Sequence, residues 1–152
     1  MIIVGTDTYI TVNEADEILT GCHNDSLLEQ WLALSVEDKE CYLRTATYKI
    51  DCLPVSGYKH NAKQTLQFPR GMSTEIPYKV KLATAEEALS AIDIELLKRV
   101  SLQQQGVKSV SLGSASESYS DDNVSFACSN PLLSKTAYNY MRQFLVGSAV
   151  II

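Results

Sequence analysis

Basic and aromatic side chains alternate in one stretch of this sequence, and they are the residues that suggest a binding chemistry. Aromatic rings can stack on unpaired bases while lysine and arginine neutralise phosphates, a combination typical of proteins that bind single-stranded nucleic acid. The stretch therefore predicts a surface that contacts DNA or an acidic partner. It contains Tyr58, Lys59, His60, Lys63, Phe68 and Arg70, with Lys79 and Lys81 on the helix expected next.

Some of these side chains have a simpler interpretation. Leu66 and Phe68 are two residues apart, so in an extended segment they point to the same side. We expect Phe68 to enter the core and anchor the loop. For Lys59, Lys63 and Arg70 two interpretations stay open, plain solvation or contact with an acidic neighbour or DNA.

The formal net charge of −5 is unevenly distributed. Residues 58–81 carry five basic and one acidic side chain, an excess of +4, whereas residues 1–57 carry three basic and ten acidic ones. Affinity for DNA comes mainly from neutralised phosphates, so a dedicated DNA-binding domain is more often basic overall. The charge therefore argues against DNA binding as the main task.

The sequence predicts neither an enzyme nor a cofactor. His23 lies beside Cys22 and His60 lies in the basic stretch, which does not supply the four ligands that a structural zinc site needs. Glu86 and Glu87 fall within a predicted helix, where we expect them on the solvated outer face. No nucleophile, base and orienting group come together.

The length of 152 residues suits a single domain, and 45% hydrophobic residues indicate a globular protein. No apolar run approaches the roughly 18 residues that a membrane span needs, and the N-terminus lacks the features of a signal peptide. We therefore expect a soluble protein that is not exported. The four cysteines match no metal or redox spacing, and we expect them reduced and mostly buried; they are Cys22, Cys41, Cys52 and Cys128.

The elements that position these residues are predicted to be mainly α, a small bundle of four or five helices with a long central loop and a short β-hairpin or extended arm. Thr11 with Glu14 forms a capping-box pattern at the first helix. The expected helices cover about 12–20, a short segment around Leu27 to Leu32, Ser35 to about Ile50, one long helix from Pro77 to about Leu102, and a last helix that starts at Asn130 or Ser134 and ends near Leu145.

Two further segments are candidates for contacts between subunits. Residues 107–120 alternate apolar and serine positions, which favours a hairpin or extended arm over a serine-rich linker. The tail, residues 148–152, is apolar beyond the cap of the last helix, and a monomer would expose it. The candidate interface residues are Val107, Val110, Leu112, Tyr119, Val150, Ile151 and Ile152.

Three motifs carry a family resemblance: Tyr9-Ile10-Thr11-Val12-Asn13-Glu14-Ala15-Asp16, Leu66-Gln67-Phe68-Pro69-Arg70, and Gln105-Gly106-Val107-Lys108-Ser109. With them the chain resembles the head-to-tail adaptor or head-completion proteins of tailed bacteriophages, from Tyr9 to about Tyr140. The resemblance implies a helical homo-oligomer, a ring commonly of twelve copies in the virion neck. Such a ring lies below the portal protein, extends the channel for double-stranded DNA, and docks tail or stopper proteins without a cofactor.

Some proteins of this kind carry a competing description as DnaT-like single-stranded-DNA-binding proteins, similar to a primosomal factor. A single-stranded-DNA-binding or replication-accessory protein would use the same basic and aromatic loop. Because the net charge argues against that function, the adaptor is the main hypothesis and the single-strand binder is the alternative.

Overall fold

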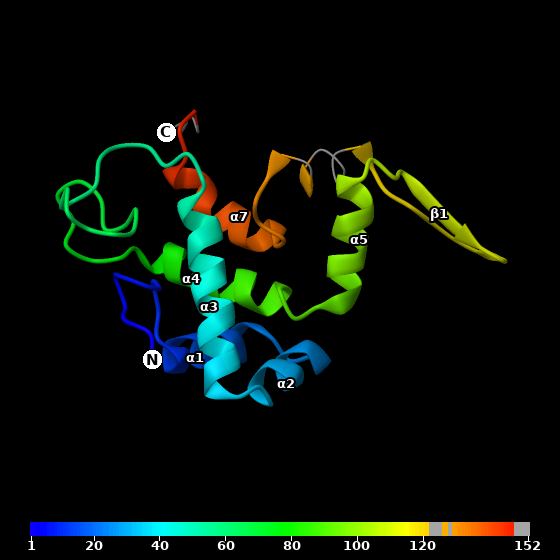
Figure 1. The fold of residues 1–152 in the computed structure, drawn as a ribbon, viewed down its shortest axis with the longest axis horizontal. Helices are drawn as coiled ribbons and strands as arrows, with labels where there is room; N and C mark the ends of the chain where they lie inside the picture. Colours follow the sequence, from blue (N-terminus) through cyan, green and yellow to red (C-terminus); the bar gives the residue numbers. More distant parts are fainter. Residues whose placement is uncertain (122–125, 128, 148–152) are drawn as a thin grey trace.

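The computed structural model describes residues 1–121, 126–127 and 129–147. The predicted class, mainly α with a long central loop and a short hairpin, is confirmed (Figure 1). The elements are α1 (Val12–Cys22), α2 (Ser26–Leu32), α3 (Val36–Asp51), α4 (Tyr78–Ser90), α5 (Ile94–Gln104), β1 (Ser109–Leu112), β2 (Ala115–Ser118), α7 (Lys135–Met141) and the 3-10 helix η1 (Arg142–Phe144).

Local capping residues set where the first helices begin, as the sequence predicted. The Thr11 hydroxyl accepts from the Glu14 amide at 3.1 Å, and the Glu14 carboxylate accepts from the Thr11 amide at 2.9 Å. Asp25 caps α2 and Ser35 caps α3 in the same way, each accepting from the backbone amide three residues on. These side chains satisfy amides that the first turn of a helix leaves without partners.

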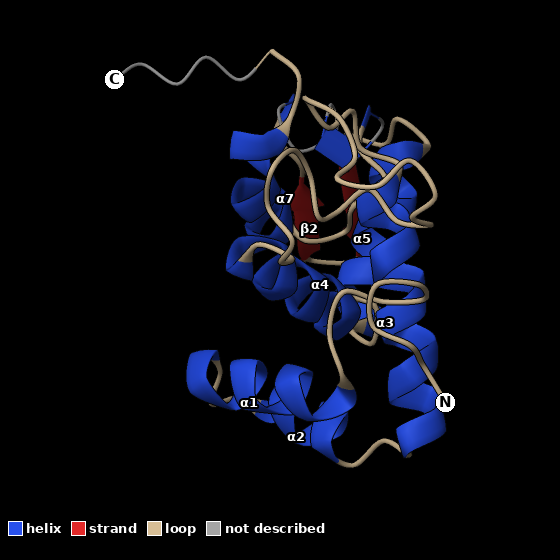
Figure 2. Ribbon diagram, turned by 90° about the vertical axis from the view of Figure 1, so that its left-hand side faces the viewer, coloured by secondary structure: helices blue, strands red, loops and turns tan. Residues whose placement is uncertain are grey.

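Helix α4 is the centre of the bundle and packs against α1, α2, α3 and α7. Its buried alanines, among them Ala83, Ala85 and Ala88, let neighbouring helices approach closely. One hydrophobic cluster lies toward α1, α2 and the first half of α3, and the other lies toward α7 and the central loop. In Figure 2, α1 and α2 form the layer beneath α4.

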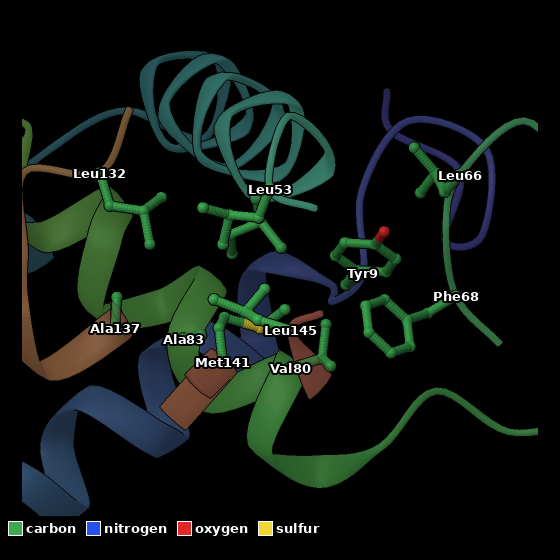
Figure 3. Packing of buried hydrophobic residues seen from close by; sticks show 11 residues of the cluster. Tyr9, Leu53, Leu66, Phe68, Val80, Ala83, Leu132, Ala137, Met141 and Leu145 are labelled. Carbon is green, nitrogen blue, oxygen red and sulfur yellow. The ribbon is translucent and has the colours of Figure 1, made fainter. Parts of the chain in front are cut away.

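Phe68 and Leu66 both enter the core, as predicted, and each is 1% exposed. The Phe68 ring meets Tyr9 edge-on at 5.8 Å between ring centroids (Figure 3). It meets Phe144 of η1 in the same way at 5.2 Å. The loop is thus anchored between the N-terminal segment and the C-terminal 3-10 helix.

The prediction of one long helix over residues 77–102 is wrong, because the chain turns after Ser90. Ala91 ends α4, and the Asp93 carboxylate starts α5 by accepting from the Leu96 amide at 3.1 Å. An Asp that caps a new first turn competes with continuation of the old helix. Helix α5 consequently stands away from the bundle and leaves Ile94 and Leu97 exposed (Figure 1).

The hairpin of β1 and β2 projects beyond α5 and lies at the opposite end of the molecule from the central loop (Figure 1). Leu112 pairs with Ala115 across a two-residue turn whose Gly113 has φ 62°, a conformation that glycine adopts without strain. All eight strand residues are exposed. An ion pair between Arg99 and Glu117 at 2.8 Å links the hairpin to α5.

The expectation of mostly buried cysteines is wrong for the three that the structure describes. Cys22, Cys41 and Cys52 are exposed and unpaired. Each occupies an outward position on its helix or at a helix end, where hydrophobic neighbours such as Leu19, Leu43 and Leu53 take the inward positions. Cys128 lies outside the described residues.

Candidate nucleic-acid interface

The central loop, residues 52–77, joins α3 to α4 and closes on itself through a short antiparallel contact. Lys59 lies opposite Arg70 in this contact. The His60 amide donates to the Pro69 carbonyl at 3.1 Å, and the Gly71 amide donates to the Tyr58 carbonyl at 2.9 Å. The two limbs of the loop therefore hold each other in a defined register.

The Arg70 guanidinium organises this loop from within. Its Nε donates to the Ser56 carbonyl at 2.9 Å, and its Nη2 donates to the Gly57 carbonyl at 2.5 Å. Its Nη1 donates to the Gln67 side-chain oxygen at 2.7 Å. All three nitrogens thus bind loop acceptors, so the predicted phosphate-contacting role has to compete with a structural one.

A second organising side chain, Gln64, was not singled out from the sequence. Its Nε2 donates to the carbonyls of Leu66 and Pro69 at 2.8 and 2.9 Å. Its Oε1 accepts from the Asn61 amide at 3.0 Å. An amide offers both donors and an acceptor, which suits it to a loop whose backbone groups lack helix or sheet partners.

Asp51, at the end of α3, holds the loop to the bundle. It accepts from the Tyr9 hydroxyl and from the Gln67 amide, the latter at 3.3 Å. Burial raises the pKa of the Asp51 carboxyl, and this outweighs the lowering effects of the Tyr9 hydrogen bond and of the positive charges on Lys59 and Arg70. Burial and the neighbouring Asp51 charge also raise the pKa of Tyr9.

Lys59 and Arg70 therefore face the body of the protein. Both exert their charge on Asp51, and the Lys59 Nζ lies 3.4 Å from the Gln64 carbonyl oxygen, to which it donates. Side chains alternate along an extended segment, so Tyr58 and His60 point to the other side. The antiparallel contact separates an inner pair of cations from an outer pair of rings.

The outer face of the loop, defined here as Tyr58, His60 and Lys63, is open to solvent. Tyr58 is 66% exposed as a residue. His60 and Lys63 are also exposed, and one nitrogen of the His60 ring lies 3.0 Å from the Gly71 carbonyl oxygen. This face offers two flat rings and a cation on a backbone that the inner side chains hold in place.

The two predicted cations on α4 differ in availability. Lys81 pairs with Glu14 of α1 at 2.9 Å, whereas Lys79 is exposed beside the exposed ring of Tyr78. Of the five candidate cations, Lys63 and Lys79 are the ones whose ammonium groups have no hydrogen bond or ion pair within the described residues.

Residues 2–149 match the family described as "putative DnaT-like ssDNA binding protein". The chain belongs to this family. Neither a comparison with curated proteins nor one with solved structures found a match. Of the two hypotheses drawn from the sequence, the match supports the single-strand binder, and nothing in the comparisons supports membership of the head-to-tail adaptor family.

The DnaT-like family match includes the hairpin, where the described interface candidates lie. Leu112 is 84% exposed and Val110 is also exposed, on the same face of the hairpin. Val107 and Tyr119 are half-buried at its base, where the Tyr119 amide donates to the Lys108 carbonyl at 2.7 Å. Val150, Ile151 and Ile152 lie outside the described residues.

In this DnaT-like protein, Glu86 and Glu87 are buried, so the prediction of a solvated outer face is wrong. Helix α4 is surrounded by other helices, and both carboxylates bind partners from them. The Glu86 carboxylate lies 2.9 Å from the His23 Nε2. The Glu87 carboxylate, 0% exposed as a residue, accepts from the amides of Leu133 and Ser134 just before α7.

The described residues offer neither a metal site nor a membrane-spanning helix. They bring together no group of three or more His, Cys, Asp and Glu side chains able to hold a metal ion. Within residues 1–121, 126–127 and 129–147, no helix has the length and apolar character that a membrane span requires.

Proposed function

We propose that the protein binds single-stranded DNA through the outer face of the central loop. The observation that carries this proposal is Tyr58, 66% exposed as a residue, on a backbone held by Arg70 and Gln64. A ring on a rigid support loses little conformational entropy when a base stacks on it. Membership of the DnaT-like family supports the same ligand.

The charge distribution indicates that stacking contributes more than phosphate contacts. The whole chain has a net charge of −5, and the cations that stay available near the loop are Lys63 and Lys79. Two neutralised phosphates give a salt dependence with a slope of only about −1.4 for single strands. Stacking supplies roughly 1–3 kcal/mol per base and requires bases that are not paired.

The test is a fluorescence anisotropy titration of a labelled oligonucleotide, single-stranded and as a duplex, at two salt concentrations. We expect the single strand to bind more tightly, and Tyr58→Ala to weaken that binding roughly tenfold. Tyr48→Ala is the matched control, because Tyr48 is also an exposed tyrosine but lies on α3 rather than in the central loop. Equal affinity for both DNA forms, or no effect of Tyr58→Ala, would refute the proposal.

As a second candidate, we propose that the protein assembles as a head-to-tail adaptor ring in the virion neck, between a portal protein and tail or stopper proteins. The exposed hairpin favours it. An isolated two-stranded hairpin is marginally stable, and its edges offer backbone groups to which a neighbouring chain can add a strand. The apolar Val110 and Leu112 on one face would gain burial in such a contact.

Electron microscopy and sedimentation at high protein concentration test the assembly. We expect closed rings, commonly of twelve copies, for the wild type and smaller species for Leu112→Glu. Ser111→Glu is the control, since Ser111 is the neighbouring residue on the opposite face of the hairpin. A protein that stays monomeric at every concentration in solution, and that forms no ring in virions, would count against this proposal.

A further inference from the structure

A pocket of about 210 Å³ opens between the central loop and η1. Its volume is below the roughly 300–1,000 Å³ of pockets that hold drug-sized ligands, so it suits a single flat ring system. Phe68, Arg70 and Ser73 line it from the loop, and Gln143 and Phe144 line it from η1. A larger pocket of about 610 Å³ lies beside Gly147, at the end of the described residues.

One wall of this pocket is aromatic. The rings of Phe68 and Phe144 meet edge-on, with an interplanar angle of 75°. Phe68 is buried, whereas Phe144 is half-buried and keeps part of its ring accessible. Phenyl rings attract other flat rings through offset stacking or edge contacts.

A second wall is the flat guanidinium of Arg70. Because Nε, Nη1 and Nη2 each donate to a loop acceptor, most of the edge of the group is used, and its face and one Nη2 N–H are left for a ligand. The face of an arginine stacks on nucleobases, and its fixed charge adds attraction to their π-systems. The same hydrogen bonds that compete with phosphate binding hold the Arg70 guanidinium in place beside the pocket.

Polar groups lie at the edge of the pocket. Gln143 is exposed, and its amide has no hydrogen-bond partner in the part of the chain that the structure describes. The Ser56 hydroxyl donates to the Phe144 carbonyl at 3.0 Å and can still accept a hydrogen bond. An amide and a hydroxyl supply the donors and acceptors that the edge of a nucleobase needs.

The pocket lies close along the chain to the outer face of the loop, on the side toward which Arg70 points. Ser56 lies two residues before Tyr58, and Arg70 directly precedes Gly71, whose amide binds the Tyr58 carbonyl. We infer that the pocket takes one unpaired nucleobase of a strand that stacks another of its bases on Tyr58; this inference rests on the proposed single-strand binding. A base in a duplex cannot enter without unpairing, so the pocket also selects against double-stranded DNA.

The experiment compares two labelled oligonucleotides of the same length. One is an ordinary single strand, and the other is an abasic strand, which keeps the sugar-phosphate backbone but has no bases. Anisotropy titrations are made with the wild type, Gln143→Ala and Phe144→Leu. We expect the wild type to bind the base-bearing strand at least tenfold more tightly than the abasic strand. We expect both variants to weaken the base-bearing strand several-fold and to leave the abasic strand unchanged.

A matched control is Phe126→Leu, because Phe126 is another half-buried ring in an edge contact, with Tyr138, away from the loop. Thermal unfolding of each variant checks that the fold survives, and Gln143→Ala, an exposed substitution, keeps the test valid if Phe144→Leu unfolds. A fluorescent 2-aminopurine in the strand gives a second readout, since its emission falls when the base stacks in the pocket.

The outcomes separate the pocket from the binding surface. Wild-type protein that binds both strands equally well overturns the base pocket together with the stacking on Tyr58. Gln143→Ala and Phe144→Leu proteins that bind the base-bearing strand as tightly as the wild type, while Tyr58→Ala weakens it, overturn the pocket alone. Variants that weaken both strands to the same extent also overturn it. A protein that binds neither strand overturns the pocket together with the proposed function.

Discussion

Lys49 of α3 and Glu87 of α4 form an ion pair of 3.1 Å in which the carboxylate is buried and the lysine is partly exposed. The other bonds of Glu87 run to the backbone amides of Leu133 and Ser134, which precede α7. One side chain therefore fastens three helices that are far apart in the sequence.

Glu87→Ala should be among the most destabilising single substitutions in the protein. It leaves the buried Ser134 amide and the partly buried Leu133 amide without an acceptor and removes the partner of Lys49, a loss of about 3–5 kcal/mol in the free energy of unfolding. Lys49→Ala should cost less, because the amides still bind Glu87. Urea unfolding measures both, with Glu95→Ala on the exposed face of α5 as the control. An unchanged unfolding midpoint for Glu87→Ala would contradict this expectation.

The break between α4 and α5 distinguishes two alanines that lie three residues apart. Ala88 is fully buried against its neighbours, whereas Ala91 ends α4 and is half-exposed. Ala88→Asp should lower the stability by several kcal/mol because it buries an unpaired charge. Ala91→Asp should lower it much less. Equal melting temperatures for the two variants would argue for a continuous helix.

Glu14 should make stability depend on acid pH. Burial alone would raise the pKa of this carboxyl, but the hydrogen bonds from Lys81 and from the Thr11 amide, together with the Lys81 charge, hold it below its usual value of 4.5. The folded state therefore releases the proton more readily than the unfolded chain. The stability that Glu14 contributes is present above pH 4.5 and is lost as the pH falls through the folded pKa.

Urea unfolding of the wild type and of Glu14→Gln between pH 7 and pH 3 checks the sign. The difference in the free energy of unfolding should shrink as the pH falls, because the carboxylate that Lys81 and Thr11 stabilise becomes protonated. A difference that grows toward low pH would mean that the pKa is raised in the folded state.

Arg70→Lys should loosen the central loop although it keeps the charge. A lysine ammonium is a single point donor and cannot bind the acceptors of Ser56, Gly57 and Gln67 in one plane. Amide hydrogen exchange at His60 and Gly71, whose amides hold the two limbs together, should become faster. Arg44→Lys on α3 serves as the control for the same chemical change. Unaltered exchange at both amides would show that the loop does not depend on Arg70.

The features that sequence alone predicted well are those with local causes. Thr11 with Glu14 and the serine at position 35 act within one helical turn, so their spacing is enough to place the start of a helix. The inward turn of Leu66 and Phe68 follows from their separation by two residues. These patterns carry their own physical explanation.

Long-range partners explain most of what the sequence could not predict. From the sequence we expect Glu87 to be a solvated helical residue, because nothing local shows that Lys49 and Leu133 lie beside it in the fold. From the sequence Arg70 is a candidate phosphate ligand, because nothing local shows that its N–H groups donate to carbonyls of the loop. Asp93 could continue a helix or cap a new one, and the packing of α4 against four other helices decides between them.

The central loop and the hairpin occupy opposite ends of the molecule (Figure 1). A ligand at one end leaves the other end accessible, so a substitution in the hairpin should not change the intrinsic affinity of the loop for a strand. If copies join through their hairpins, several weak loop sites would engage one strand together. The avidity of such an assembly can exceed the affinity of each loop by orders of magnitude. Loading of DNA would then depend on protein concentration more steeply than a one-to-one complex allows.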